Sequence, residues 1–353
     1  MLDFKVKSII HNYEVAFINN SSKKIAQEIR SSDVFVIDKN IIDLHPQVAK
    51  AIHNDNLLIE INANEKNKSY QSLIPIINKL IKIGFRKNHR LIGIGGGITQ
   101  DITSFIASII YRGVSWIFFP TTLLAQGDSC IGSKTSINFG KYKNQVGGFY
   151  PPNKVFIDVN FLNSLSESEM QSGFGEMCHY FIIASKKDFD NYKLYYKKAL
   201  LDKSVLSKII SRSLLIKKSY IEIDEFDQNE RQIFNYGHSF GHAIESLTNY
   251  KVPHGIAVSL GMDMANFISV KMGLLKDEIR KDIRQFLEQI WQGYNIKEMD
   301  VDKFRDALSK DKKNIGNELR LILSRGYGKV FKAPVKNDIQ LHKWLIEYFN
   351  REL

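Results

Sequence analysis

Three histidines and one glutamate have the side-chain types and spacing of a metal site. His238 and His242 are four residues apart, so on a helix they share one face, and His254 follows in a Pro-His-Gly turn that could fold it back. Glu176 lies in a separate segment and offers a carboxylate. Imidazoles with a carboxylate suit Zn²⁺ or a similar divalent ion that keeps coordination positions open for substrate. Histidines on a helix surface, or satisfied within a core, are the alternative.

A glycine-rich segment offers a second kind of chemistry. Gly93, Gly95, Gly96 and Gly97 precede Asp101 and lie between an expected strand and an expected helix. Without Cβ atoms the backbone can turn sharply and approach a pyrophosphate, whose charge suits the N–H groups at a helix start. The spacing is not the G-x-G-x-x-G of dinucleotide sites, so a plain tight turn stays open beside nucleotide binding.

Cationic and amide side chains form a third group. A phosphate or carboxylate needs such donors converging from several loops. Each lysine taken alone is more often a solvated surface residue, so the group indicates an anion site without fixing its members. The candidates are Lys134 with the nearby Asp128, Lys143 with Asn144, Arg231, and Lys329.

Two kinds of sequence periodicity predict the helices and strands that must position these residues. In the first part of the chain, short β-branched runs alternate with helical periodicity, as in βαβ units around a parallel sheet. The expected strands are 33–38, 57–62, 90–95, 114–119 and 155–158, and the expected helices are 72–84 and 98–110.

Beyond residue 165 the periodicity is mainly helical. Ser166 and Glu169 form a capping-box pattern that predicts a helix running to Ile183. Further helices are expected at 192–220, 233–247, 256–272 and 276–291, and a short strand at 319–323. We therefore predict an α/β domain over residues 1–165 and a mainly α-helical domain over residues 166–353.

Composition excludes several classes of protein. With 44% hydrophobic residues in 353 the chain can bury a sizeable core, and 49 Lys+Arg against 38 Asp+Glu give a net charge of +11. No nucleic-acid-binding motif is recognisable in the sequence, and no apolar run is long enough to span a membrane, so we expect neither partner. Two cysteines cannot form a disulfide framework, and a secretory signal pattern is missing, so we expect a cytoplasmic protein.

Taken together and in this order, the motifs resemble those of the 3-dehydroquinate synthase family of sugar phosphate cyclases. The resemblance extends from about Glu65 to Lys329. Its most specific segments are Gly95-Gly-Gly-x-x-x-Asp101, Tyr111-Arg-Gly113, Pro120-Thr-Thr-Leu-Leu-Ala-Gln126, Gly132-Ser-Lys-Thr135, Lys143-Asn144, Gly175-Glu176, Asn235-x-Gly-His-x-x-Gly-His242 and His254-Gly255.

The resemblance implies a Rossmann-like NAD domain, a helical metal-binding domain and a homodimer. NAD contacts would fall on Glu65, Lys68, Gly95, Gly96, Gly97, Asp101, Thr121, Thr122 and Lys143. The ligands of Zn²⁺ or Co²⁺ would be Glu176, His238 and His254. Substrate contacts would come from Lys134, Asn144, Lys217, Arg231, His242, Lys329 and, reaching across from the other subunit, Arg112. Catalytic positions would be Asp128, Lys134, His179, Asn235 and His242.

The reaction implied by the resemblance leaves its cofactor unchanged. NAD⁺ takes hydride from a ring carbinol polarised by the metal, and the new ketone acidifies the neighbouring C–H. Phosphate is eliminated, NADH returns the hydride, the ring opens, and an aldol step closes a carbocycle.

Two positions depart from the family pattern. His179 stands where most members carry a lysine three residues after the metal glutamate, and Ser133 replaces the second glycine of Gly-Gly-Lys-Thr. Since i and i+3 residues share a helix face, His179 should point to the same cavity as Glu176 and change the substrate contacts. Arg231 is kept and suits a substrate carboxylate.

These departures leave the substrate open between two phosphorylated heptuloses. We favour 3-deoxy-arabino-heptulosonate 7-phosphate, which has the carboxylate, with formation of 3-dehydroquinate. The alternative is a divergent cyclase that makes another cyclitol from sedoheptulose 7-phosphate or a related sugar phosphate. A metal- and NAD-dependent polyol dehydrogenase would share the two-domain plan but needs no phosphate cluster. A basic binding protein without catalysis is disfavoured by the intact metal ligands.

Overall fold

The computed structural model describes residues 2–52, 56–140, 142–310 and 318–352, and the chain divides into two compact units. The first unit comprises Met1–Leu165 with Leu201–Phe226, and the second comprises Ser166–Leu200 with Asp227–Leu353. The predicted boundary at residue 165 assigned residues 201–226 to the helical domain, whereas the structure places this segment with the first unit. A long-range contact contributes to this placement, because Ser213 of this segment donates a buried hydrogen bond to the Gly127 carbonyl at 2.8 Å.

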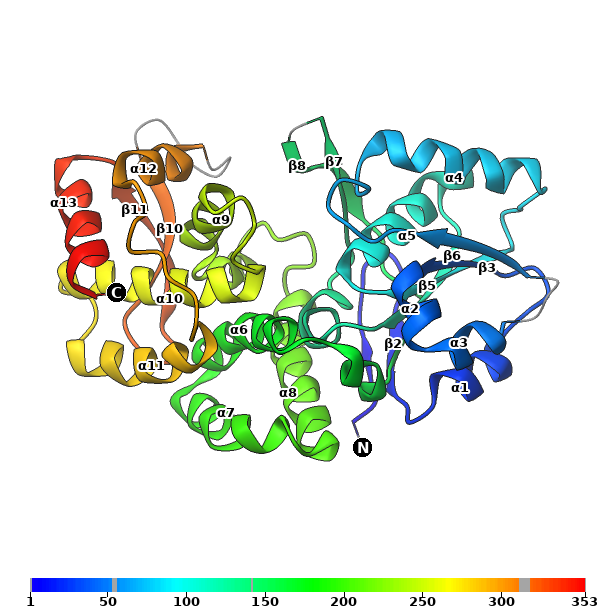
Figure 1. Ribbon diagram of the computed structural model, residues 1–353, viewed down its shortest axis with the longest axis horizontal. Helices are drawn as coiled ribbons and strands as arrows, with labels where there is room; N and C mark the ends of the chain where they lie inside the picture. The colour runs from blue at the N-terminus through cyan, green and yellow to red at the C-terminus, as the bar shows by residue number, and fades with distance from the viewer. Residues whose placement is uncertain (1, 53–55, 141, 311–317, 353) are drawn as a thin grey trace. The chain divides into compact units, whose positions relative to one another are not determined.

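A seven-stranded sheet organises the first unit (Figure 1). Its order is β1-β2-β9-β6-β5-β3-β4; β1 and β2 pair antiparallel, and the other neighbours pair parallel. Its strands are β1 (Phe4–Val6), β2 (Tyr13–Phe17), β3 (Val34–Asp38), β4 (Leu57–Ile61), β5 (Arg90–Gly95), β6 (Ser115–Pro120) and β9 (Lys154–Ile157). A separate antiparallel hairpin pairs β7 (Lys134–Phe139) with β8 (Tyr142–Phe149).

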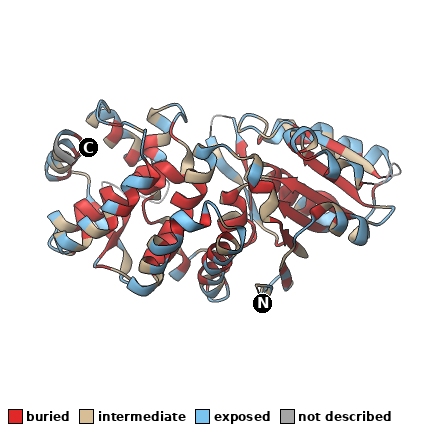
Figure 2. Ribbon diagram, turned by 60° about the horizontal axis from the view of Figure 1, so that its bottom comes forward, coloured by how far each residue is buried: buried red, intermediate tan, exposed pale blue. Residues whose placement is uncertain are grey.

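The first unit also contains several helices. They are α1 (Ser21–Glu28), α2 (Lys39–Leu44), α3 (Pro46–Lys50), α4 (Tyr70–Lys82), α5 (Gly97–Ile109) and α8 (Lys203–Ile221). β3 and β5 carry continuous apolar runs that are buried, as Figure 2 shows for the strands of the sheet. Strands covered on both faces need such runs rather than an alternating pattern.

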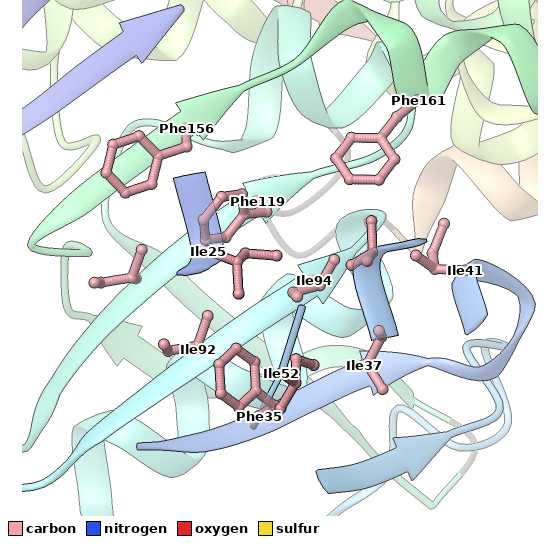
Figure 3. Close-up of a cluster of buried hydrophobic side chains, with 12 residues drawn as sticks. Ile25, Phe35, Ile37, Ile41, Ile52, Ile92, Ile94, Phe119, Phe156 and Phe161 are labelled. Atoms are coloured by element: carbon pink, nitrogen blue, oxygen red, sulfur yellow. The ribbon is translucent and has the colours of Figure 1, made fainter. Parts of the chain in front are cut away.

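One apolar core lies between the sheet and α1, α2 and α3 (Figure 3). Phe35 and Ile37 from β3, Ile92 and Ile94 from β5, and Phe119 from β6 meet side chains from these helices there. The core therefore fixes the strands whose carboxyl ends carry the glycine-rich segment.

The second unit is mainly helical. It contains α6 (Glu167–Ala184), α7 (Lys186–Ala199), α9 (His238–Leu247), α10 (His254–Lys271), α11 (Asp277–Ile290), α12 (Val301–Ser309) and α13 (Ile339–Glu347), with a hairpin of β10 (Glu318–Ser324) and β11 (Val330–Lys336). The Ser166 side chain caps α6, and Glu169 completes the capping box. No described helix is both long and apolar enough to cross a membrane.

Glycines bring α6, α9 and α10 into backbone contact. A Cβ on Gly175 would lie 2.3 Å from the Gly255 carbonyl oxygen, and one on Gly261 would lie 2.1 Å from the Gly237 carbonyl oxygen. Side chains larger than hydrogen would hold these helices apart. Gly175, Gly237 and Gly255 are each adjacent in sequence to a predicted metal ligand, so the close packing positions all three ligands.

We predict that Gly255→Ala will disrupt this helix packing. Its Cβ would lie 1.8 Å from the Ser172 carbonyl oxygen, a backbone atom that cannot move alone. We expect a loss of about 3 kcal/mol in the free energy of unfolding, measured by urea denaturation. The control is Gly148→Ala, since no atom lies within 4 Å of that Cβ. Equal stability of the two variants would contradict the packing account.

Candidate functional site

Three side chains of the second unit converge in a candidate metal centre. Glu176 comes from α6, and His238 and His254 are the first residues of α9 and α10. His238 Nε2 lies 3.3 Å from Glu176 Oε1, and His254 Nε2 lies 3.5 Å from Glu176 Oε2. One ligand atom from each of the three lies within 4.8 Å of the others. Glu176 is only 3% exposed, so a carboxylate is buried at the centre of the group.

Hydrogen bonds orient both imidazoles of this centre. His238 Nδ1 lies 3.3 Å from the Tyr236 carbonyl oxygen, which can only accept a hydrogen bond. His254 Nδ1 lies 3.0 Å from Glu245 Oε2. A proton on each Nδ1 leaves the Nε2 lone pairs directed at the Glu176 carboxylate. Such a convergence of acceptors is stabilised by a cation between them.

The Glu176 carboxylate itself fits a cation site. Among the described residues, none donates a hydrogen bond to its Oε2. Burial raises the pKa of Glu176, but when His238 and His254 also carry a proton on Nε2, their positive charge outweighs burial and holds that pKa well below its ordinary value. The carboxyl is therefore ionised at neutral pH, as a metal ligand must be.

We predict that Glu245→Gln will weaken metal binding without removing a ligand. The amide could present its N–H₂ group to His254 Nδ1 and lose the charge that favours the required tautomer. We expect a 10- to 100-fold lower affinity for Zn²⁺, measured by competition with a chelator. Glu278→Gln is the control, because Glu278 is exposed on α11. An unchanged affinity in Glu245→Gln would contradict the orienting role.

His242 lies beside this centre on α9. Its ring stacks on that of His254 with centroids 5.7 Å apart. With Glu245 and His254 it also forms a group whose ligand atoms lie within 4.8 Å. His242 is exposed, unlike Glu176, so it can meet a molecule from solvent.

His179 is buried beside the Glu176 carboxylate. It is 1% exposed, and its Nδ1 is 3.9 Å from Glu176 Oε1. Its ring packs against Tyr180 and Phe234, at centroid distances of 3.9 and 5.9 Å. The imidazole thus occupies an aromatic enclosure next to the metal centre.

In the first unit, the glycine-rich segment joins the end of β5 to α5. A Cβ on Gly95 would lie 2.3 Å from Thr99 Oγ1, and one on Gly96 would lie 2.8 Å from Thr122 Cγ2. Gly96 is the N-cap of α5, so the helix start carries no capping side chain from that residue. The Thr121 N–H donates to the Gly95 carbonyl at 2.9 Å and joins the ends of β5 and β6. Carboxyl ends of parallel strands with a bare helix start fit a dinucleotide phosphate.

Charged side chains gather beside this segment. Lys68 Nζ lies 2.5 Å from Asp101 Oδ2 on α5 and 2.7 Å from Asn144 Oδ1 on β8. Lys143 Nζ lies 3.6 Å from Glu65 Oε1. The structure thus brings together the residues predicted for NAD, and it places Asn144, predicted for substrate phosphate, among them.

Asp128 and Lys217 form a partly buried pair in the first unit. Lys217 Nζ donates to the Asp128 carbonyl and to its Oδ1, both at 2.7 Å. Lys217 is 6% exposed, so its ammonium is held by Asp128 rather than extended into solvent. Lys134 begins β7 a few residues further on and is exposed.

The remaining predicted residues lie at separate places within their own units. Arg231 is buried in a short helical turn, Glu230–Asn235, that also contains Asn235. The Asn235 amide donates to the Gln232 carbonyl at 2.9 Å. Lys329 lies in the turn between β10 and β11.

Arg112 lies in a strained turn after α5 in the first unit. Tyr111, Arg112 and Gly113 have φ values of 50°, 60° and 102°. The Lys87 ammonium donates to the carbonyl oxygens of all three residues. This lysine stabilises a backbone conformation that non-glycine residues rarely adopt.

Two orienting residues escaped prediction from the sequence. Glu245 lies seven residues after His238, two helical turns along the same face, and this spacing was a usable signal. Asn138 donates to Glu65 Oε1 at 2.8 Å and accepts from the Asn144 N–H at 2.9 Å. Its position on β7 gave no signal, since the hairpin itself was not expected.

Comparison with known families identifies the relationship. A family model described as 3-dehydroquinate synthase N-terminal matches residues 58–172, and one described as 3-dehydroquinate synthase C-terminal matches residues 173–314. The chain belongs to the 3-dehydroquinate synthase family. The resemblance predicted from the motifs is thereby confirmed.

Relatives within the 3-dehydroquinate synthase family cover between about three quarters and nearly all of the chain. The chain is 33% identical to the 3-dehydroquinate synthase of Campylobacter concisus over 342 residues, 96% of each protein. It is 40% identical to that of Thermodesulfovibrio yellowstonii over 276 residues, 77% of each.

Solved structures confirm the predicted fold. A 2-deoxy-scyllo-inosose synthase complexed with carbaglucose-6-phosphate, NAD⁺ and Co²⁺ has a TM-score of 0.86 at 22% identity, over 98% of this chain and 99% of that one. A glycerol dehydrogenase from Schizosaccharomyces pombe has a TM-score of 0.67 at 14% identity, over 96% and 89%. At these identities the likeness concerns the fold alone, which cyclases and dehydrogenases share.

Proposed function

We propose that the protein is a 3-dehydroquinate synthase that converts 3-deoxy-arabino-heptulosonate 7-phosphate to 3-dehydroquinate and phosphate. The observation that carries the proposal is the centre of Glu176, His238 and His254, whose donor atoms converge in a chain related over its full length to such synthases. The buried Arg231 suits a substrate carboxylate, which sedoheptulose 7-phosphate lacks.

The protein's residues fit two bound groups. Glu176, His238 and His254 would hold Zn²⁺ or Co²⁺, and the Gly95–Gly97 segment, with Lys68 and Asp101 beside it, would hold NAD⁺. When bound, NAD⁺ accepts and returns a hydride, and the metal polarises an oxygen of the substrate.

The chain's own residues would mainly bind and orient NAD⁺ and the substrate. The uncapped N–H groups at the start of α5 would donate hydrogen bonds to the pyrophosphate oxygens. The substrate phosphate would meet Lys134, His242 and Lys329. Lys217 fixes the Asp128 carboxylate, which would then orient a substrate hydroxyl.

We further propose a cytoplasmic homodimer in which Arg112 reaches the partner's substrate phosphate. The exposed turn that contains Arg112 is held by Lys87 and could present the guanidinium outward. Both cysteines are buried and free, as is usual for proteins of a reducing compartment.

The experiment that tests the proposed function measures phosphate release and NADH accumulation in the same reaction. Purified protein with NAD⁺ and Zn²⁺ or Co²⁺ should release phosphate from the heptulosonate phosphate without accumulating NADH. Polyol dehydrogenases have the same fold, so glycerol is the parallel substrate. Sustained NADH formation with glycerol, and no phosphate release, would overturn the proposal.

We predict that His179→Lys will shift substrate preference toward the heptulosonate phosphate. A lysine would bring an ammonium into the aromatic enclosure next to Glu176 and add a partner for the substrate carboxylate. We expect the ratio of kcat/KM for the heptulosonate phosphate over sedoheptulose 7-phosphate to rise about tenfold. An unchanged ratio in a folded variant would show that His179 does not determine specificity.

A further inference from the structure

The loop 128–134 joins Asp128 to Lys134, two residues of the proposed substrate site. Both ends of this loop form hydrogen bonds with one segment of the same unit, residues 217–225, which comprises the end of α8 and the residues after it. At the start, Lys217 holds Asp128 by two hydrogen bonds of 2.7 Å. At the end, the Ser133 hydroxyl donates to Glu225 Oε1 at 2.9 Å.

Ser133 has an unusual backbone for a residue with a side chain. Its φ is 65°, in the left-handed region that favours glycine, and it is 6% exposed. The family pattern has a glycine at this position. The chain therefore accepts a conformational cost that the bond to Glu225 offsets.

Glu225 is a buried carboxylate that accepts two further hydrogen bonds, from Ser8 and Ile9. It is 5% exposed. Ser8 Oγ donates to its Oε1 at 2.7 Å, and the Ile9 N–H donates to its Oε2 at 2.7 Å. The carboxylate is thus fixed independently of Ser133 and offers that hydroxyl a rigid acceptor.

Backbone hydrogen bonds around Ser133 also restrict the position of Lys134. The Tyr150 N–H donates to the Ser133 carbonyl at 2.6 Å, and the Gly132 N–H donates to the Tyr13 hydroxyl at 3.0 Å. The two residues before Lys134 are therefore held, and Lys134 itself pairs with Phe149 in the hairpin.

We propose that the Ser133–Glu225 hydrogen bond is a positioning device for Lys134 in phosphate binding. The inference rests on the proposed function, because it takes Lys134 as a phosphate ligand. Ser133 touches no substrate; it fixes the direction in which the next residue leaves the loop.

The test compares two serines that donate to the same oxygen of Glu225. Ser133→Ala removes the donor on the loop, and Ser8→Ala removes a donor remote from it. Each variant of the full-length protein is titrated with inorganic phosphate by calorimetry, assayed for KM and kcat, and melted to obtain Tm. We expect Ser133→Ala to raise the Kd for phosphate and the KM about five- to tenfold with kcat within twofold. Ser8→Ala should lower Tm comparably and leave both constants unchanged.

Ser133→Gly keeps the test valid if the alanine variant does not fold. Glycine relaxes the backbone at φ 65°, so its Tm should stay near that of the wild type while the Kd for phosphate rises. Unchanged Kd values in both Ser133 variants would overturn the positioning role. Absence of turnover in the wild type, with phosphate binding intact, would instead overturn the proposed function.

Discussion

Glu176→Gln is expected to lower metal content to background and turnover by roughly a thousandfold. Glutamine keeps the shape of the side chain but replaces a negative oxygen ligand by an N–H₂ group. In the wild type, His238 Nε2 and His254 Nε2 lie 3.3 and 3.5 Å from the Glu176 carboxylate oxygens. The glutamine variant would remove the negative charge that faces both imidazoles. Elemental analysis of the purified variant measures metal stoichiometry directly.

Thermal denaturation gives a second readout of the same substitution. Zn²⁺ that binds only the folded protein should raise the Tm of the wild type and not that of Glu176→Gln. Glu167→Gln is the matched control, because Glu167 is exposed on the same helix. Metal stoichiometry at the wild-type level in Glu176→Gln would show that the metal binds elsewhere.

Asp263→Asn is expected to cost about 3–5 kcal/mol of the free energy of unfolding. Asp263 is fully buried on α10, the helix that begins with His254. It accepts two hydrogen bonds of 3.0 Å from Arg280, one of 2.7 Å from Arg284 and one of 2.9 Å from the Tyr348 hydroxyl. An amide cannot balance the two guanidinium groups, so their charges would stay buried without compensation.

Urea denaturation followed by tryptophan fluorescence measures this loss. Glu288→Gln is the control, because its carboxylate pairs with the same Arg284 but is 48% exposed. Surface pairs contribute about 1 kcal/mol or less. A stability loss in Asp263→Asn no larger than in Glu288→Gln would show that the buried hydrogen bonds of Asp263 do not stabilise the packing of α10.

Strong local patterns made most of the sheet and of α6 predictable. β3 and β5 are apolar runs bounded by polar residues, and they lie within one residue of the expected ranges. The Ser166–Glu169 capping box also begins α6 as expected. The helical pattern expected around 192–220 is present, but the chain divides it into α7 and α8 with a break between them, which the pattern did not indicate.

Long-range packing explains what the sequence could not predict. α8 has an ordinary helical pattern, and long-range contacts such as those of Ser213 and Lys217 with residues 127–128 place it in the first unit. The β7–β8 hairpin is partly exposed and alternates poorly, so its period gave no signal. The histidine spacing indicated a metal site, but the orienting bond from Glu245 depends on how α9 and α10 meet.

Product analysis with two substrates tests the central claim most directly. Purified protein with NAD⁺ and Zn²⁺ or Co²⁺ is offered 3-deoxy-arabino-heptulosonate 7-phosphate and sedoheptulose 7-phosphate in parallel, and the products are identified by mass. We predict that the first substrate yields phosphate and 3-dehydroquinate, and that phosphate release from the second substrate is much slower. Release from sedoheptulose 7-phosphate alone would contradict the account, because Arg231 would then serve no substrate carboxylate and the enzyme would make a different cyclitol.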